Sequence, residues 1–150
     1  MNIYFACSIT GGRDFEPVYQ AIIAALLADG HTVPTAHLAD SGIKAMEAAI
    51  GSREVYERDV AWIRECNVLV ADVSTPSHGV GYEVAYALSI GKPVLCIHHQ
   101  DRTISKMLSG NSHPNLQVNH YQDAGQAIEI IRSFLEKASL RVPVDCEDNH

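Results

Sequence analysis

Short apolar runs alternate along the chain with longer segments in which apolar residues recur every three or four positions. Continuous apolar runs are typical of buried β-strands, and a period near 3.6 residues is typical of helices. We expect strands at residues 3–9, 31–37, 67–74, 92–98 and 116–121. We expect helices at residues 15–29, 53–66, 80–90 and 123–137, the last of them with Asp123 as its N-cap.

Strands that alternate with helices predict an α/β fold, in which right-handed crossovers build a parallel sheet with helices on both faces. Pro34 has no N–H to donate, so we place strand 31–37 at an edge of the sheet. The expected architecture is a five-stranded parallel sheet of order 2-1-3-4-5, a Rossmann- or flavodoxin-like three-layer sandwich. This topology predicts a ligand crevice at the carboxyl ends of strands 3–9 and 67–74.

The length of 150 residues suits one domain. We assign residues 1–138 to a single α/β domain and residues 139–150 to an acidic C-terminal tail that we expect to be flexible. The net charge of −7 and the scattered Lys and Arg residues argue against polymeric nucleic acid and anionic membranes as partners. A small anionic ligand is still compatible with this charge, because a local anion site needs no positive field over the whole surface.

The apolar segments carry no signal for export or membrane insertion. The longest apolar run, residues 21–28, is too short to span a bilayer, and residues 1–9 lack the basic region of a signal peptide. We therefore expect an intracellular protein, in the cytoplasm and also in the nucleus. The cysteines form no C-x-x-C pair and read as reduced, mostly structural thiols; they are Cys7, Cys66, Cys96 and Cys146.

No metal and no cofactor are expected. His98 and His99 are adjacent rather than three or four residues apart, and the chain contains no H-E-x-x-H motif. Neither G-x-G-x-x-G nor G-x-x-x-x-G-K-[ST] occurs, which removes the main sequence support for nicotinamide cofactors and triphosphate hydrolysis.

The segment "CSITGGRDF" after the first strand has the composition of a phosphate cradle. Gly11 and Gly12 allow backbone N–H groups to converge on an anion, the following helix adds its dipole, and Arg13 can supply a bidentate charge. A glycine turn that serves chain geometry alone, with a solvated Arg13, is the other interpretation. The loop by itself leaves both open.

The segment "STPSHGVGYE" follows the third expected strand and reaches the same crevice. It contributes Ser77, Gly79 and Gly81, and we place Glu83 in the first turn of the next helix. An acidic side chain there also interacts favourably with the helix dipole, so a purely structural role for Glu83 stays open.

Asp59 lies in the middle of the apolar stripe of helix 53–66, at helical spacing from Val55 and Ile63. Burying a carboxylate without a partner costs several kcal/mol, so Asp59 must be hydrogen-bonded, paired or used in chemistry. It could also cap a neighbouring loop. Two carboxylates and an anion cradle around one crevice suggest cleavage of a glycosidic bond, with one carboxylate as nucleophile and a second residue handling protons.

With these residues identified, the chain resembles the 2'-deoxynucleoside 5'-phosphate N-hydrolases, relatives of the nucleoside 2-deoxyribosyltransferases. "YFACSITGGR" is similar to the family's Y-F-C-G-S-I-R-G-G-R and "YERDVAWI" to its H-E-Q-D-L-x-W-L. "DVSTPSHGVGYEVAYAL" is similar to E-V-T-Q-P-S-L-G-V-G-Y-E-L, and "RTISKMLSG" to R-V-L-S-A-M-I-R-G. The motifs occur in order between about residues 3 and 121, and jointly they are specific.

The resemblance implies hydrolysis of the N-glycosidic bond of 2'-deoxynucleoside 5'-monophosphates to a free base and 2-deoxyribose 5-phosphate. It implies Glu83 as the nucleophile that forms a glycosyl-enzyme, Asp59 as the carboxylate that orients the sugar and Glu83 or assists proton transfer, and Tyr4 near the reacting centre. It also implies a homodimer in which Ser105 completes the neighbour's phosphate site, with Met107 nearby. The candidate substrate- and phosphate-binding residues are Ser8, Ile9, Thr10, Gly11, Gly12, Arg13, His37, Ser77, Gly79, Ser105 and Met107.

Two departures from the family pattern concern the first loop. Thr10 stands where the pattern has arginine, which removes a positive charge that Arg13 could replace. Ala6 and Cys7 replace a Cys-Gly pair.

Several questions stay open at this level. Two rival functions are a deoxyribosyltransferase without a phosphate requirement and a nucleotide-sensing domain without turnover. His37 ends the second expected strand near the crevice, where a structural role competes with a binding role. Residues 38–52 are compatible with a mobile lid or with a short helix.

Overall fold

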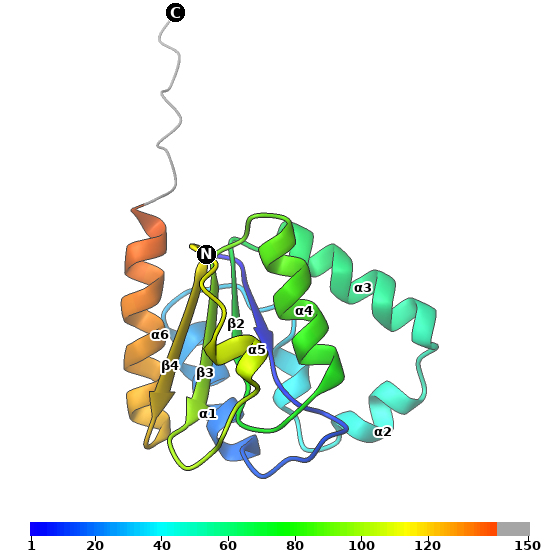
Figure 1. Ribbon diagram of the computed structural model, residues 1–150. Coiled ribbons are helices and arrows are strands. Elements are labelled where there is room, and N and C mark those ends of the chain that lie inside the picture. The colour runs from blue at the N-terminus through cyan, green and yellow to red at the C-terminus, as the bar shows by residue number, and fades with distance from the viewer. Residues whose placement is uncertain (141–150) are drawn as a thin grey trace, which may run out of the picture.

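The central sheet consists, within residues 1–140 that the computed structural model describes, of four parallel strands (Figure 1). They pair in the order β1-β2-β3-β4. Every residue of β1 and β2 is buried, as expected for strands covered on both faces. The bounds are Ile3–Ala6 for β1, Val68–Asp72 for β2, Val94–His99 for β3 and Leu116–Tyr121 for β4.

Helices cover both faces of this sheet. α1 and α6 pack on one face and α3 and α4 on the other, so the three-layer arrangement is confirmed (Figure 1). The bounds are Glu16–Ala28 for α1, Ile43–Ala48 for α2, Ser52–Glu65 for α3, His78–Ser89 for α4, Lys106–Ser109 for α5 and Ala124–Ser139 for α6. A 3-10 helix, η1, spans Ala36–Ala39.

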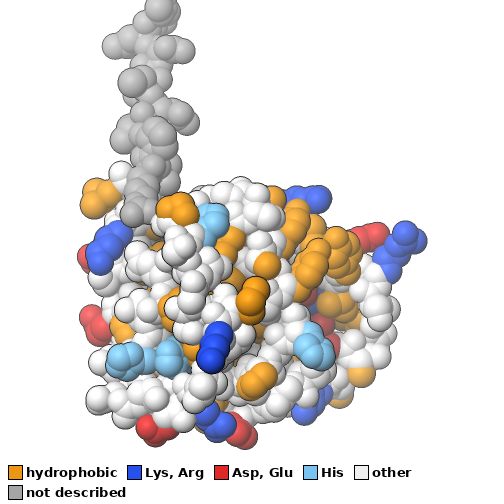
Figure 2. All heavy atoms as spheres, viewed as in Figure 1, with side chains coloured by type: hydrophobic (Ala, Val, Ile, Leu, Met, Phe, Trp, Pro, Cys, Tyr) orange, Lys and Arg blue, Asp and Glu red, His pale blue; other side chains and the backbone are white. Residues whose placement is uncertain are grey.

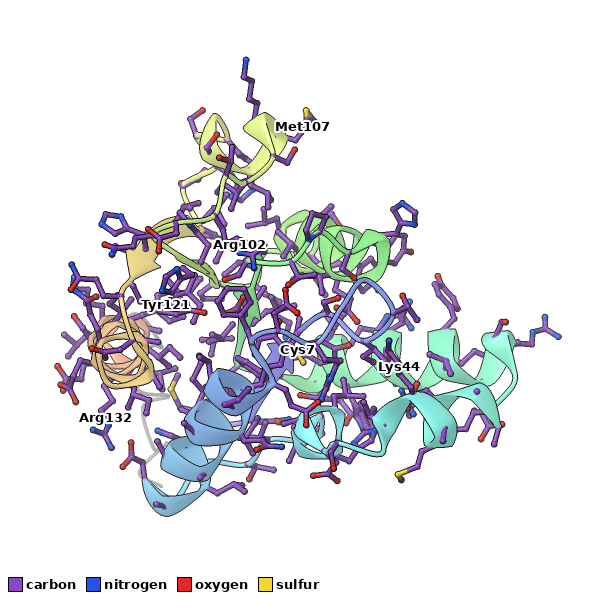
Figure 3. All side chains as sticks on the ribbon, turned by 90° about the horizontal axis from the view of Figure 1, so that it is seen from below. Cys7, Lys44, Arg102, Met107, Tyr121 and Arg132 are labelled. Atoms are coloured by element: carbon purple, nitrogen blue, oxygen red, sulfur yellow. The ribbon has the colours of Figure 1, made fainter. Side chains whose placement is uncertain are left out.

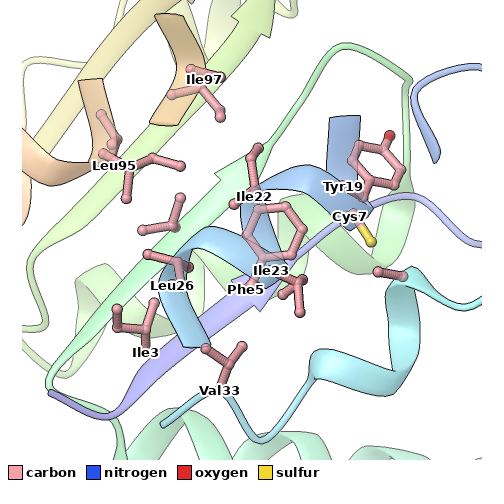
Figure 4. Packing of buried hydrophobic residues seen from close by; sticks show 14 of the residues in the cluster. Ile3, Phe5, Cys7, Tyr19, Ile22, Ile23, Leu26, Val33, Leu95 and Ile97 are labelled. Atoms are coloured by element: carbon pink, nitrogen blue, oxygen red, sulfur yellow. The ribbon is translucent and has the colours of Figure 1, made fainter. Parts of the chain in front are cut away.

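Alternation along β1 divides its side chains between the two faces. Ile3 and Phe5 pack against Ile22 and Leu26 of α1 in one hydrophobic cluster (Figure 4). Tyr4 belongs to the opposite cluster, with residues of α3 and α4. This alternation places the Tyr4 phenol on the side of the sheet that carries Glu83.

The predicted five-stranded sheet of order 2-1-3-4-5 is wrong, because residues 31–37 do not form a strand. Their pairing with β1 is limited to an isolated bridge between Asn2 and Thr32. Pro34 cannot donate a ladder hydrogen bond, and the chain turns there into η1. The Thr35 hydroxyl then accepts the Phe5 N–H at 3.0 Å, which satisfies a backbone donor of β1 without a fifth strand.

The predicted helices are present with shifted ends. Asp123 caps α6 as predicted, with its side chain accepting the Gln126 N–H at 2.9 Å. Residues 38–52 contain the short helix α2, one of the two conformations considered. Cys7, Cys66 and Cys96 are free and buried. Most of the predicted tail, residues 141–150, lies outside the described residues, and none of the described helices is long and apolar enough to cross a membrane.

Candidate active site

A cavity of about 640 Å³ opens at the carboxyl ends of β1 and β2, where the crevice was predicted. The loops that follow these two strands and the first part of α4 form one wall, and α2 and α3 form the other. Figure 3 looks onto this edge of the sheet. Of the candidate residues, Ile9, Thr10, Asp59, Ser77, Gly79 and Glu83 line the cavity.

Glu83 lies on α4 with its carboxylate against the phenol of Tyr4. The Tyr4 hydroxyl donates a hydrogen bond of 2.6 Å to Glu83 Oε1. Burial raises the pKa of Glu83 to about 7, the Tyr4 hydrogen bond opposes the shift, and the nearby charge of Asp59 adds to it. Near neutral pH Glu83 therefore exists in both protonation states, and its ionised form is available as a nucleophile.

The prediction that Glu83 lies in the first turn of its helix is wrong. α4 begins at His78, because the Ser77 side chain caps it by accepting the Val80 N–H at 3.3 Å. Glu83 is therefore in the second turn, where the charge of the helix N-terminus has largely fallen off. Interaction with the helix dipole does not explain this carboxylate.

Asp59 faces the same cavity from α3, with 16% of its side chain exposed. Arg58 Nε donates to Asp59 Oδ1 at 2.8 Å. Burial raises the pKa of Asp59, and the hydrogen bond and charge of Arg58 oppose that shift. No backbone N–H within residues 1–140 donates to Asp59, so the alternative role as a loop cap has no support in its contacts.

Arg58 is a site residue that sequence reasoning missed. Its Nη1 and Nη2 atoms donate to the two carboxylate oxygens of Glu47 at 3.0 and 3.2 Å, and the guanidinium lies 4.9 Å from the centre of the Trp62 ring. These contacts fasten α2, which carries Glu47, to α3. The local sequence holds no signal for them, because Glu47 comes from another element.

His37 lies behind this ion pair and not on the cavity wall. Its Nε2 atom is 3.6 Å from Glu47 Oε1, and its ring packs edge-on against Trp62 with centroids 5.8 Å apart. In this position His37 supports the wall that α2 forms.

The loop after β1 packs directly on the loop after β2. A Cβ atom at Gly11 would lie 2.3 Å from the carbonyl oxygen of Pro76, so only glycine allows this approach. Gly12 has φ +132°, which other residues rarely adopt. Ser8 is fully buried beneath the turn, and within the described residues its hydroxyl has no hydrogen-bond partner.

Replacing Gly11 by alanine is expected to lower stability by about 1–3 kcal/mol, the usual cost of inserting a methyl group into a packed contact. The displaced loop should also weaken substrate binding, because Ile9 and Thr10 of the same loop line the cavity. Thermal unfolding and KM measure the two effects. Gly51→Ala is the matched control, since a Cβ there meets no atom within 4 Å. Equal stability of the two variants would contradict the proposed close packing.

Arg13 lies beneath the loop and does not line the cavity. Its guanidinium donates to Glu16 Oε2 at 2.9 Å and to three backbone carbonyls, those of Ser8, Leu38 and Asp40. Only 13% of its side chain is exposed. Arg13 therefore braces the loop from inside the protein, and four of its five N–H donors are already occupied.

Ser105 and Met107 lie away from this cavity. They line a second groove of about 650 Å³, which runs along α4 and α5. Ser105 caps α5 by accepting the Met107 N–H at 3.2 Å, and Met107 is 82% exposed at the tip of that helix (Figure 3). Within one chain neither residue reaches the cavity of Glu83.

A buried network anchors the start of the loop after β2 and was also missed. Asp72, at the end of β2, accepts the Tyr121 hydroxyl at 2.7 Å and the Ser74 N–H at 2.9 Å. The Ser74 hydroxyl in turn accepts the His99 N–H at 2.8 Å. Because Asp72 is fully buried, these bonds hold the loop that leads to Ser77 in one conformation.

Sequence comparison relates the chain to enzymes that act on nucleosides and nucleotides. Residues 3–133 match the model of the family described as nucleoside 2-deoxyribosyltransferase. The chain is 40% identical over 118 residues to the Methanococcoides burtonii protein assigned as 2'-deoxynucleoside 5'-phosphate N-hydrolase 1, covering 79% of this chain and 97% of that one. It is 35% identical over 139 residues to the 5-hydroxymethyl-dUMP N-hydrolase of Homo sapiens, covering 89% and 79%.

Two solved structures share the fold. The solution structure of BlsM superimposes with a TM-score of 0.76 and 20% identity, over 99% of this chain and 97% of that one. The Clostridium botulinum CMP N-glycosidase BcmB superimposes with a TM-score of 0.63 and 17% identity, over 87% and 97%.

Proposed function

Because the chain belongs to the nucleoside 2-deoxyribosyltransferase family, we infer that it is a nucleotide N-glycosidase. Its reaction is hydrolysis of the N-glycosidic bond of 2'-deoxynucleoside 5'-monophosphates to a free base and 2-deoxyribose 5-phosphate. The relatives named N-hydrolases support this reaction. The observation that carries it is that Glu83 and Asp59 line one cavity, with Tyr4 hydrogen-bonded to Glu83.

In the first step, ionised Glu83 attacks C1' of the deoxyribose. A bond forms between a carboxylate oxygen and C1', the C1'–N bond breaks, and the base leaves with the electron pair of that bond. Asp59 donates a proton to the departing base. Burial raises the pKa of Asp59, which is the direction that a proton donor requires.

In the second step, water attacks C1' of the glycosyl-enzyme. Asp59, now ionised, takes a proton from that water, and Glu83 leaves as a carboxylate. The Tyr4 hydroxyl, 2.6 Å from Glu83 Oε1, stabilises the carboxylate charge at both ends of the cycle.

The substrate phosphate binds between the two loops that line the cavity. Backbone N–H groups of the loop after β1 and the N-terminus of α4, with Ser77 and Gly79, supply the donors that a phosphate needs. Ser8 contributes an unpartnered hydroxyl beneath the same turn, within the described part of the chain.

The active form is a homodimer in which Ser105 of one chain completes the phosphate site of the other. The groove along α4 and α5 supports this proposal, because it is mainly apolar and holds both Ser105 and Met107. Hydrophobic side chains also gather over α3 and α4 (Figure 2). Such a surface suits burial against a second copy of the chain.

A base-release assay tests the function. Deoxyguanosine monophosphate and 5-hydroxymethyl-dUMP should lose their bases, whereas deoxyguanosine and guanosine monophosphate should react far more slowly. Equal turnover of the unphosphorylated nucleoside, or transfer of deoxyribose to an added base, would favour a transferase. Tight nucleotide binding without any turnover would favour a sensing domain.

A further inference from the structure

The proposed phosphate site has few positive charges in its walls, although its ligand is a dianion. Thr10 lines the cavity where the related pattern has arginine, and it is neutral. Arg13 uses four of its five N–H donors on Glu16 and on backbone carbonyls, and its side chain does not line the cavity. Neither residue brings a positive charge to the cavity.

The carboxylates around the cavity make this shortage more acute. Glu47, Asp59 and Glu83 all line the cavity. Arg58 is paired with Glu47 and Asp59, and it does not line the cavity itself. A phosphate that enters would therefore meet acidic groups whose neighbouring cation is already committed, and repulsion between like charges would weaken its binding.

Lys44 of α2 differs from these residues. It is the single Lys or Arg in the described lining of the cavity, and its side chain is exposed. Within residues 1–140 no acidic group lies within ion-pair distance of it. Figure 3 shows its side chain reaching from α2 toward the loop that follows β1.

The position of Lys44 is held by the wall that carries it. Glu47, one turn further along α2, is fastened to Arg58 by two hydrogen bonds. The start of the lysine side chain is therefore fixed relative to the cavity, while its flexible stem lets the ammonium group move to a ligand.

From this arrangement we propose that Lys44 binds the 5'-phosphate of the substrate and supplies the positive charge that Thr10 and Arg13 do not. This inference rests on the proposed function, since it takes the ligand to be a deoxynucleoside 5'-monophosphate. It assigns to Lys44 the selection of phosphorylated over unphosphorylated substrates. The ammonium group is a compact point charge, which suits phosphate without requiring bidentate geometry.

Steady-state kinetics of Lys44→Ala test the assignment. KM for a deoxynucleoside monophosphate should rise about tenfold or more, in line with the loss of a charged hydrogen bond, while kcat stays close to the wild-type value. The contact is made equally in the ground state and the transition state, which is why KM changes alone. Lys44→Arg should keep most of the affinity. Lys137→Ala, which removes an exposed lysine on α6 away from the cavity, is the matched control.

Binding of 2-deoxyribose 5-phosphate, measured by calorimetry, gives a second readout that needs no turnover. Lys44→Ala should bind it about tenfold more weakly than wild type, with 2-deoxyribose as the uncharged comparison. A Lys44→Ala variant that matches Lys137→Ala in both KM and binding would overturn the inference. So would a variant that loses kcat at unchanged KM. Wild-type protein that binds the sugar phosphate but releases no base would instead refute the proposed function.

Discussion

Replacing Glu83 by glutamine is expected to lower kcat by about 10³-fold or more, because an amide cannot form the ester bond to C1' on which the covalent route depends. The variant should fold normally. The glutamine side chain would keep an oxygen that can accept the Tyr4 hydroxyl, and the substitution removes a group whose ionised form burial disfavours. Far-UV circular dichroism and thermal unfolding check the fold, and base release checks the rate.

The control for this experiment is Glu136→Gln, which changes an exposed carboxylate on α6. Its rate should equal that of wild type. Mass spectrometry of the wild-type protein quenched during turnover should also find a deoxyribose-phosphate adduct on the peptide that contains Glu83. An active Glu83→Gln variant, or an adduct on another residue, would exclude the proposed nucleophile.

Replacing Asp59 by asparagine is expected to lower kcat by about 10²-fold, the usual contribution of a general acid and base. In this variant the side chain at position 59 can neither protonate the departing base nor take a proton from the attacking water. Arg58 retains its two hydrogen bonds to Glu47, so the wall formed by α2 should stay in place. A full-rate Asp59→Asn variant would remove Asp59 from proton transfer.

The Asp59→Asn variant should also change the pH dependence of kcat/KM. The pKa of Glu83 is raised to about 7, and the nucleophile must be ionised, so kcat/KM of wild type should rise with pH through about 7. In its ionised form, Asp59 contributes to that raised pKa through repulsion between the two carboxylates. Its removal should move the rise to lower pH.

Tyr4→Phe should move the rise in the opposite direction. The Tyr4 hydrogen bond favours ionised Glu83 and so lowers its pKa, and its loss should shift the rise in kcat/KM to higher pH. Parallel shifts in the Asp59→Asn and Tyr4→Phe variants would contradict the assignment of this rise to Glu83.

Much of the scaffold could be predicted from local pattern. The central strands are continuous apolar runs, and the apolar positions of α1 that recur at helical spacing, Tyr19, Ile22 and Leu26, are buried. The failure at residues 31–37 has a specific cause. A strand in this position needs a regular ladder of backbone hydrogen bonds. Pro34 cannot donate to such a ladder, and the Phe5 N–H of β1 bonds to the Thr35 hydroxyl instead. The apolar pattern does not contain this side-chain contact.

For the two carboxylates too, local pattern predicted one part of the outcome and tertiary contacts decided the other. The amphipathic period of α3 singled out Asp59, and the segment after the third expected strand singled out Glu83. The capping of α4 by Ser77, which moves Glu83 into the second turn, was not anticipated. Arg13 was expected to be solvated or to face the phosphate. It instead donates to the backbone carbonyls of residues 8, 38 and 40, which only the folded chain brings around it.

By itself, the amino-acid sequence determined the α/β class, the four longest helices, the inner strands, and the edge of the sheet at which polar residues collect. These features follow from periods of a few residues. Only the tertiary structure decided which charges meet. Tyr4 reaches Glu83 across 79 residues, and Glu47 reaches Arg58 from a different helix. The pKa of Glu83 and the isolation of Lys44 depend on burial and on distances between such partners, which arise only when the elements pack together.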